Sequence, residues 1–172
     1  MLNDQLKSQL QQLLQLMEGD VVLKASLGSD DKSKELKELL DEVSVASDHI
    51  TIEASDLKRT PSFSVDKPNE TSGITFAGLP MGHEFNSLVL ALLQVSGRPP
   101  KEEQAIIDQI KAIDRPLHFE TYISLTCQKC PDVVQALNLM SLLNPNISHT
   151  MIDGSIFREE SENIMAVPAI FL

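Results

Sequence analysis

The chain has 172 residues, with 25 acidic and 14 basic side chains and a formal net charge of −11 at pH 7. This length corresponds to one ordinary domain or two small ones, and 42% hydrophobic residues argue against a disordered acidic chain. The negative charge disfavours a surface for nucleic acid or anionic membranes, because phosphate groups would repel it. Two cysteines are too few for a secreted disulfide scaffold.

The first residues predict an amphipathic helix rather than a secretory signal. The chain does not begin with a basic segment followed by an apolar one. Apolar residues recur there at helical spacing and would pack on the body of the protein: Leu2, Leu6, Leu10, Leu13, Leu14 and Met17. A membrane-surface helix is the alternative, but Lys7 is its single basic residue. Since the longest apolar run, Leu88 to Leu93, is far below the ~20 residues of a membrane span, we expect a cytoplasmic protein.

Residues 21–95 predict strands and helices in the order β-α-β, then β-β-α. Alternating or β-branched apolar runs indicate the strands, and apolar residues at helical spacing indicate the helices. The expected elements, in chain order, are the strand 21–27, the helix carrying Leu36, Leu39, Leu40 and Val43, the strands 50–54, 62–65 and 74–77, and the helix 83–95.

A linker and a second, similar series follow. The segment 97–100, Gly-Arg-Pro-Pro, is typical of a connection between domains. Each half opens with a helix, continues β-α-β, and then has a proline directly before a strand. We therefore expect two domains, residues 1–97 and 98–172. The expected elements of the second are the helix 101–113, the strand 117–125, the helix carrying Val133, Val134, Leu137, Met140 and Leu143, the strand 147–152, a short helix around 157–163 and the strand 169–172.

The two halves align without a gap when the first is moved forward by 98 positions. Apolar positions then coincide, whereas Ser29 and Lys32 fall on Cys127 and Cys130. The first half thus keeps the framework of the second without its cysteines. By the same comparison the second half lacks roughly thirty residues, including one strand and the last helix. We therefore expect a fragment of a longer protein, with an exposed sheet edge in its second half.

The motif Cys127-Gln-Lys129-Cys130-Pro131 follows an expected strand and begins an expected helix. In this context the first thiol lies at a helix N-terminus, where unpaired N–H groups and the helix dipole stabilise a thiolate, and Lys129 adds a positive charge. Cys127 is therefore the expected nucleophile, and Cys130 is the expected resolving thiol that closes the disulfide and releases a partner. Pro131 costs no hydrogen bond in the first turn.

Three other interpretations of the cysteine pair stay open. Half of a zinc site is one, although a second C-x-x-C is absent and the four histidines are scattered without ligand spacing: His49, His83, His118 and His149. Two ordinary buried cysteines are another. The third is a purely structural disulfide, which the short loop and the expected cytoplasmic location disfavour.

The dipeptide Val167-Pro168 supports the redox interpretation. A proline that opens a strand about forty residues beyond a C-x-x-C fits the cis-proline loop beside the dithiol of thioredoxin-like folds. An ordinary edge-strand proline is the alternative. Thr60-Pro61 occupies the matching position in the first half, so the pattern recurs with the fold.

These motifs together resemble the N-terminal domain of the flavoprotein subunit of alkyl hydroperoxide reductases. In the second half the resemblance covers CQKCPDVVQALNLM at 127–140, followed by the motifs at 143–145, 152–154 and 167–169. In the first half it covers Phe76-Ala-Gly-x-Pro-x-Gly-His-Glu-Phe85 and the apolar run 87–93. It therefore extends over nearly the whole chain.

The resemblance implies an α/β protein of two tandem thioredoxin-like folds, with mixed central sheets and flanking helices, the second fold being truncated. It implies a protein-disulfide oxidoreductase. Electrons would pass from NADH through a flavin and a disulfide of a C-terminal reductase portion to Cys127 and Cys130. From there they would pass to the disulfide of a peroxiredoxin partner, which is the other subunit of alkyl hydroperoxide reductases, for hydroperoxide detoxification.

The same resemblance limits what is expected of this chain. No G-x-G-x-x-G occurs in it, so FAD and NADH are expected to bind in the missing portion, and no cofactor or metal is expected here. The partners it implies are the peroxiredoxin and the protein's own reductase portion. A homodimer formed through that portion stays open.

The resemblance also draws attention to Glu84, whose family counterpart lies near the dithiol and assists proton transfer. A partly buried carboxyl group with a raised pKa can accept the proton of a resolving thiol. Alternatively, Glu84 is an ordinary acidic residue at a helix start, favoured by the dipole. Two other functions stay open for the whole chain: a general two-domain disulfide oxidoreductase of glutaredoxin or thioredoxin type, and a non-catalytic interaction or metal-binding module.

Overall fold

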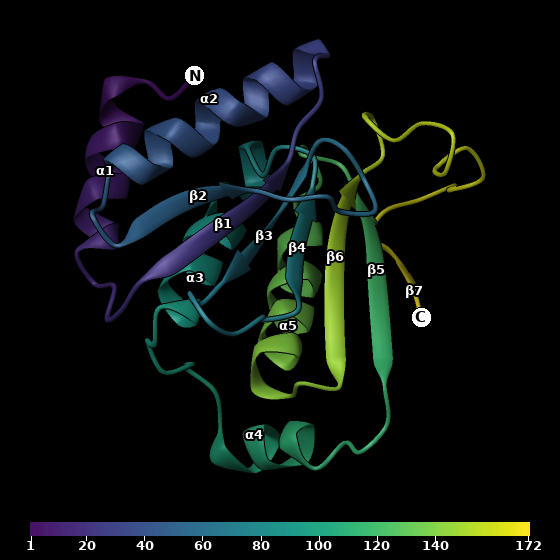
Figure 1. The fold of residues 1–172 in the computed structure, drawn as a ribbon. Helices are drawn as coiled ribbons and strands as arrows, with labels where there is room; N and C mark the ends of the chain where they lie inside the picture. Colours follow the sequence, from purple (N-terminus) through teal and green to yellow (C-terminus); the bar gives the residue numbers. More distant parts are fainter.

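One seven-stranded sheet runs through the whole chain (Figure 1). In the computed structural model, which describes residues 1–172, its strand order is β2-β1-β3-β4-β6-β5-β7. The strands are β1 (Val21–Ser26), β2 (Ile50–Ala54), β3 (Ser62–Asp66), β4 (Ile74–Ala77), β5 (Leu117–Ile123), β6 (Ile147–Asp153) and β7 (Ala169–Phe171). The pairs β1–β2, β4–β6 and β5–β6 are parallel, and the other pairs are antiparallel. The mixed sheet expected for each half is therefore present as part of one continuous sheet.

The pairing of β4 with β6 joins the two halves. Phe76 is paired with Met151 and Ala77 with Ile152, and β6 is in turn parallel to β5. Because parallel strands place their carboxyl ends at the same edge of a sheet, the segments that follow β4, β5 and β6 leave the sheet side by side. Segments distant in sequence are thereby brought to one end of the molecule.

Six helical segments accompany the sheet: α1 (Asp4–Leu14), α2 (Asp31–Val45), the 3₁₀ turn η1 (Gly82–Glu84), α3 (Phe85–Val95), α4 (Gln104–Lys111) and α5 (Cys130–Leu143). Side chains cap the first two, since Asn3 accepts a hydrogen bond from the Leu6 N–H and Asp30 accepts one from the Ser33 N–H. Figure 1 shows α3 and α5 next to each other behind the sheet. No helix is long and apolar enough to cross a membrane.

The hydrophobic core crosses the expected boundary between the halves. Phe63 stacks on Phe76 in the first half, and Leu92 of α3, Val134 of α5 and Met151 of β6 belong to the same buried cluster. Apolar side chains from both halves are thus removed from water together, which favours cooperative folding. The division into residues 1–97 and 98–172 consequently remains a prediction from the sequence repeat.

Three expected helices differ in the structure. The expected helix 83–95 begins with the 3₁₀ turn η1, and α4 is shorter than 101–113 at both ends. The helix expected around 157–163 is wrong, because the segment contains only turns. It carries three glutamates within four positions, and Glu160 is drawn into contacts with Arg59 and Tyr122. Like charges and these tertiary bonds oppose a regular helix there.

A buried histidine links the sheet to α5. The ring of His149 is fully buried in β6, with Nδ1 2.7 Å from Asn138 Oδ1 and Nε2 2.8 Å from Thr121 Oγ1. Both ring nitrogens therefore have partners, and burial lowers the pKa of His149 to about 3. The folded protein keeps this ring neutral at any pH near neutrality.

We expect His149 to make the protein sensitive to mild acid. Below pH 6.5 the unfolded chain binds a proton at this ring that the folded chain cannot bind until about pH 3, so stability falls as pH falls through this window. Between pH 7 and pH 5 the free energy of unfolding should fall by about 2 kcal/mol more in the wild type than in His149→Gln. Urea unfolding measured by circular dichroism tests this, with exposed His118→Gln as the control. Equal losses in wild type and His149→Gln would contradict it.

Candidate dithiol site

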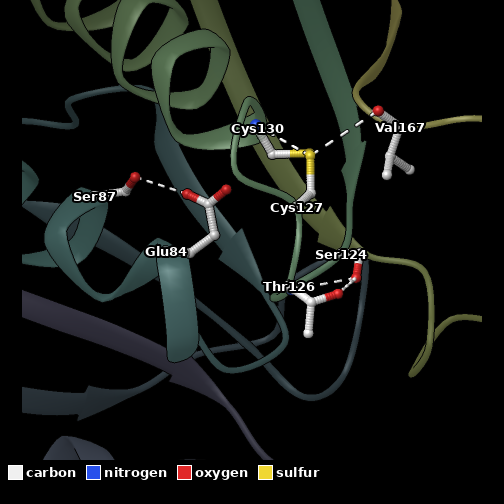
Figure 2. The surroundings of a disulfide bond; sticks show 7 residues. All are labelled: Glu84, Ser87, Ser124, Thr126, Cys127, Cys130 and Val167. Atoms are coloured by element: carbon white, nitrogen blue, oxygen red, sulfur yellow. Dashed lines mark hydrogen bonds between the residues drawn. A yellow bond between two sulfur atoms is a disulfide. The ribbon is translucent and has the colours of Figure 1, made fainter.

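The two cysteines lie where β5 gives way to α5, at the edge where the parallel strands end. They are joined in a disulfide. Cys130 is 0% exposed, whereas Cys127 is partly exposed. The backbone N–H of Cys130 donates a hydrogen bond to Sγ of Cys127 at 3.1 Å, as Figure 2 shows. Because a first-turn helix N–H points at the outer sulfur, a thiolate formed there on reduction would be stabilised.

The residues around the pair have the expected positions. Pro131 lies in the first turn of α5, where its missing N–H leaves no partner unpaired. Lys129 precedes the helix with an exposed side chain and forms no ion pair. Its contribution to the site is therefore a solvated positive charge beside the outer sulfur, weaker than that of the helix N–H.

The loop before β7 approaches the outer sulfur from the other side. The carbonyl oxygen of Val167 is 4.0 Å from Sγ of Cys127 (Figure 2). The peptide bonds Val167-Pro168 and Thr60-Pro61 are both cis, which confirms the expected cis-proline loop beside the dithiol and its counterpart in the first half.

Glu84 reaches the site from the first half. The loop after β4 docks on the segment after β5, where the N–H of His83 donates to the carbonyl oxygen of Leu125 at 3.0 Å. This approach requires a glycine at position 82, because φ there is +56° and an added Cβ would lie 2.7 Å from the same oxygen. The docked loop fixes the direction in which Glu84 leaves the backbone.

The carboxyl group of Glu84 is buried and half satisfied. Glu84 is 0% exposed, its Oε1 accepts a hydrogen bond from Ser87 Oγ at 2.7 Å, and its Oε2 has no hydrogen-bond partner. Figure 2 shows the carboxyl group directed towards the disulfide, with Ser87 on its far side. Burial raises the pKa of Glu84, and the hydrogen bond from Ser87 only partly opposes this. A carboxyl group with a raised pKa binds a proton more readily than an exposed one, so it can accept a proton from a neighbouring thiol.

A partly buried arginine, missed by the sequence reasoning, holds the surrounding loops together. The guanidinium of Arg59 donates to Glu120 of β5 at 2.8 Å and makes three hydrogen bonds to Glu160, two from Nε and one from Nη2. The Tyr122 hydroxyl also donates to Glu160 at 2.8 Å. Arg59 is adjacent to the first cis-proline segment and Glu160 lies in the loop that leads to the second. This Arg59 cluster (Arg59, Glu120, Tyr122 and Glu160) therefore ties the two loops to each other.

The Arg59 cluster has the electrostatic character of a partly buried ion pair. Although burial opposes it, hydrogen bonds to Glu160 and Glu120 raise the pKa of Arg59. The bond from Arg59 lowers the pKa of Glu160, while burial and the bond to Glu160 raise the pKa of Tyr122 to about 12. All three groups therefore keep their charge states across the physiological pH range. The structure contains no cluster of three or more His, Cys, Asp or Glu side chains that could hold a metal ion.

The chain is similar to F subunits of alkyl hydroperoxide reductases. No family model matches the chain. The alkyl hydroperoxide reductase F subunit of Staphylococcus epidermidis (strain ATCC 12228) is 76% identical over all 172 residues, and the chain spans about a third of its length (34%). The crystal structure of the NTD_N/C domain of alkyl hydroperoxide reductase AhpF from Enterococcus faecalis is 31% identical, with a TM-score of 0.91 over 99% of this chain and 90% of that one. A C503A mutant of the same E. faecalis protein is 33% identical, with a TM-score of 0.90 over 98% and 88% of the two chains.

We expect Arg59→Met to lower the free energy of unfolding by about 2 kcal/mol. Removing one partner of a fully buried ion pair costs ~3–5 kcal/mol, and the loss is smaller here because Arg59 is 9% exposed while its carboxylate partners are about a third exposed. Chemical denaturation at pH 7 measures it. The matched control is Lys58→Met, which removes an exposed cation 3.4 Å from the same Glu120 and should cost under about 0.5 kcal/mol. Equal costs for both variants would refute the role of the cluster.

Proposed function

The chain belongs to the family of the flavoprotein (F) subunits of alkyl hydroperoxide reductases, and from this premise we propose that it is the dithiol–disulfide electron-transfer module of an NADH-dependent peroxiredoxin reductase. In this proposal it takes two electrons from a flavoprotein portion of the longer protein. It gives them to the disulfide of a peroxiredoxin, the peroxidase component of an alkyl hydroperoxide reductase, which reduces hydroperoxides. FAD and NADH bind to that other portion. The protein works in the cytoplasm.

One observation carries the proposal: the partly exposed sulfur of Cys127 accepts a helix N–H while its disulfide partner Cys130 is fully buried. An accessible, stabilised thiolate beside a protected second thiol is the arrangement that disulfide exchange needs. A structural disulfide or a metal site does not require this asymmetry.

The chemistry follows from the two cysteines. After reduction, the Cys127 thiolate attacks one sulfur of the peroxiredoxin disulfide, forms a mixed disulfide and releases the other partner sulfur as a thiolate. Cys130 then gives its proton to the carboxylate of Glu84, and its thiolate attacks the Cys127 sulfur. This step restores the disulfide of the chain and releases the second partner thiolate, so two electrons have moved to the partner. In the reverse direction, when the flavoprotein portion reduces the chain, Glu84 returns the proton to Cys130.

The loop residues have supporting roles in this proposal. The carbonyl of Val167, held by the turn at Pro168, faces the sulfur on which the partner is bound, and Pro131 lets the helix begin directly after Cys130. Lys129 adds a positive charge beside the Cys127 sulfur, which favours its thiolate in a chain of net negative charge. Each of these contacts acts on Cys127, the sulfur that meets the partner.

We expect the two cysteine variants to fail at different steps. The reduced chain is mixed with the oxidised peroxiredoxin of a bacterial alkyl hydroperoxide reductase, and the products are analysed by non-reducing electrophoresis and mass spectrometry. Cys127→Ser should transfer no electrons, since Cys130 is buried, whereas Cys130→Ser should accumulate a mixed disulfide through Cys127. Ser124→Ala, next to the site but outside the disulfide, is the control and should keep the wild-type yield. Transfer by Cys127→Ser at the wild-type rate would overturn the proposal. So would stoichiometric zinc on the cysteines with no transfer.

A further inference from the structure

We propose that Ser87 and Gln135 are positioning residues, which orient the carboxyl group of Glu84 so that its exchangeable proton faces the cysteine pair. The inference rests on the proposed function, because it assigns a task to groups around the proposed proton acceptor. It concerns two residues that neither the C-x-x-C motif nor the cis-proline loop includes.

The direction of the hydrogen bonds carries the first step. Nε2 of Gln135, on α5, donates to Oγ of Ser87 at 3.1 Å. An amide NH₂ group can only donate, so the Ser87 oxygen is the acceptor in this contact and its own hydrogen remains free. That hydrogen is donated to Oε1 of Glu84 at 2.7 Å. The two hydrogen bonds therefore run in one direction, from Gln135 to Ser87 and from Ser87 to Glu84.

The direction of these hydrogen bonds decides which oxygen of Glu84 carries the proton. Oε1 is already an acceptor, whereas Oε2 is buried without a partner. A proton on Oε2 would leave the bond from Ser87 intact. Figure 2 shows the disulfide on the side of the carboxyl group that faces away from Ser87. The proton is thus bound and released at Oε2, the oxygen that faces the disulfide.

Water cannot replace this orientation. Glu84 and Ser87 are 0% and 1% exposed, so the protein alone decides how the carboxyl group is turned. The titratable groups on neighbouring elements are few. His83 is exposed beside Glu84, α3 has none, and α5 contributes Cys130, which is bonded to Cys127, and the exposed Asp132. Burial raises the pKa of Glu84 and the hydrogen bond from Ser87 opposes this rise, with no charged neighbour contributing.

Helix α5 carries both the thiol that gives up the proton and the amide that donates to Ser87. Cys130 begins α5, and Gln135 lies on that helix little more than one turn further on. Gln135 is partly exposed on the far side of Ser87, where it lines a surface cavity of about 540 Å³ together with Leu90, Gln94 and Leu139. Gln135, the first of the hydrogen-bond donors, can therefore be substituted without exposing the buried site.

A purely structural contact would account for part of these observations. Ser87 lies three residues after Glu84 at the start of α3, where such pairs are common within one turn. A structural bond changes stability alone. An orienting bond also changes the pH at which Cys130 becomes able to resolve a mixed disulfide, and this difference defines the experiment.

The test uses the reduced chain and an aromatic disulfide that releases a coloured thiolate. Attack by Cys127 releases one thiolate, and resolution by Cys130 releases the second, so the slower phase followed over a range of pH reports proton loss from Cys130. Ser87→Ala should raise the midpoint pH of this phase by roughly one unit, which makes the phase about tenfold slower near neutral pH. The reason is that the Glu84 carboxylate loses the hydrogen bond that Ser87 donates to it. Ser87→Thr, which restores a hydroxyl, should return the midpoint towards the wild type.

Further variants separate the inference from folding effects. Gln135→Met, which removes the donor from a partly exposed position, should move the midpoint in the same direction by a smaller amount. Ser141→Ala on α5 is the matched control, since that buried hydroxyl bonds only to the Leu137 carbonyl, and it should leave the midpoint unchanged. Glu84→Gln should slow the phase by about 10²-fold and abolish any further effect of Ser87→Ala.

Two outcomes would overturn the inference, and both differ from failure of the proposed function. A wild-type midpoint in Ser87→Ala, with Glu84→Gln still slow, would show that Glu84 acts without being oriented. An unchanged phase in Glu84→Gln would remove the group that Ser87 is proposed to orient. Failure of the proposed function would be visible separately, as the absence of a mixed disulfide between Cys130→Ser and the peroxiredoxin.

Discussion

The parallel pairing of β4 with β6 is the constraint on which the rest of the structure depends. It makes one sheet of two similar halves and places the carboxyl ends of β4, β5 and β6 at one edge. The loop carrying Glu84, the turn carrying Cys127 and the loop leading to Val167 all leave the sheet there. Without this pairing, a half with cysteines and a half without them would be separate folds. With it, the half that lacks cysteines supplies the buried acid of the other half.

Two buried titratable groups have different roles in this fold, one structural and one chemical. His149 has hydrogen-bond partners on both ring nitrogens, and its burial serves to connect β5, β6 and α5. Glu84 is equally buried, yet one of its oxygens has no partner. A buried polar atom left unpaired costs free energy, so its retention next to a disulfide favours a chemical role. We infer that the site gives up some stability for a carboxyl group whose proton can move.

The sequence predicted the parts of the site that local signals define. Cys127 and Cys130 follow a strand at a recognisable spacing, and Val167-Pro168 repeats the pattern of Thr60-Pro61, so local patterns alone indicated the dithiol and its cis-proline loop. Non-local contacts were not predictable: nothing in the sequence connects Arg59 with Glu160, about a hundred residues away, or Ser87 with Gln135. The wrong helix around 157–163 has the same origin, because the bond from Arg59 overrides local propensity.

The central claim is that the two halves form one site, in which Glu84 of the first half is the proton acceptor for the dithiol of the second. Titration of the Glu84 carboxyl carbon by NMR in the oxidised and in the reduced chain tests it directly. The account predicts a pKa above the ordinary value of 4.5 in both states and a change in that pKa when the disulfide is reduced, because the unpaired oxygen then faces a thiol. An ordinary pKa that does not respond to the redox state would contradict it.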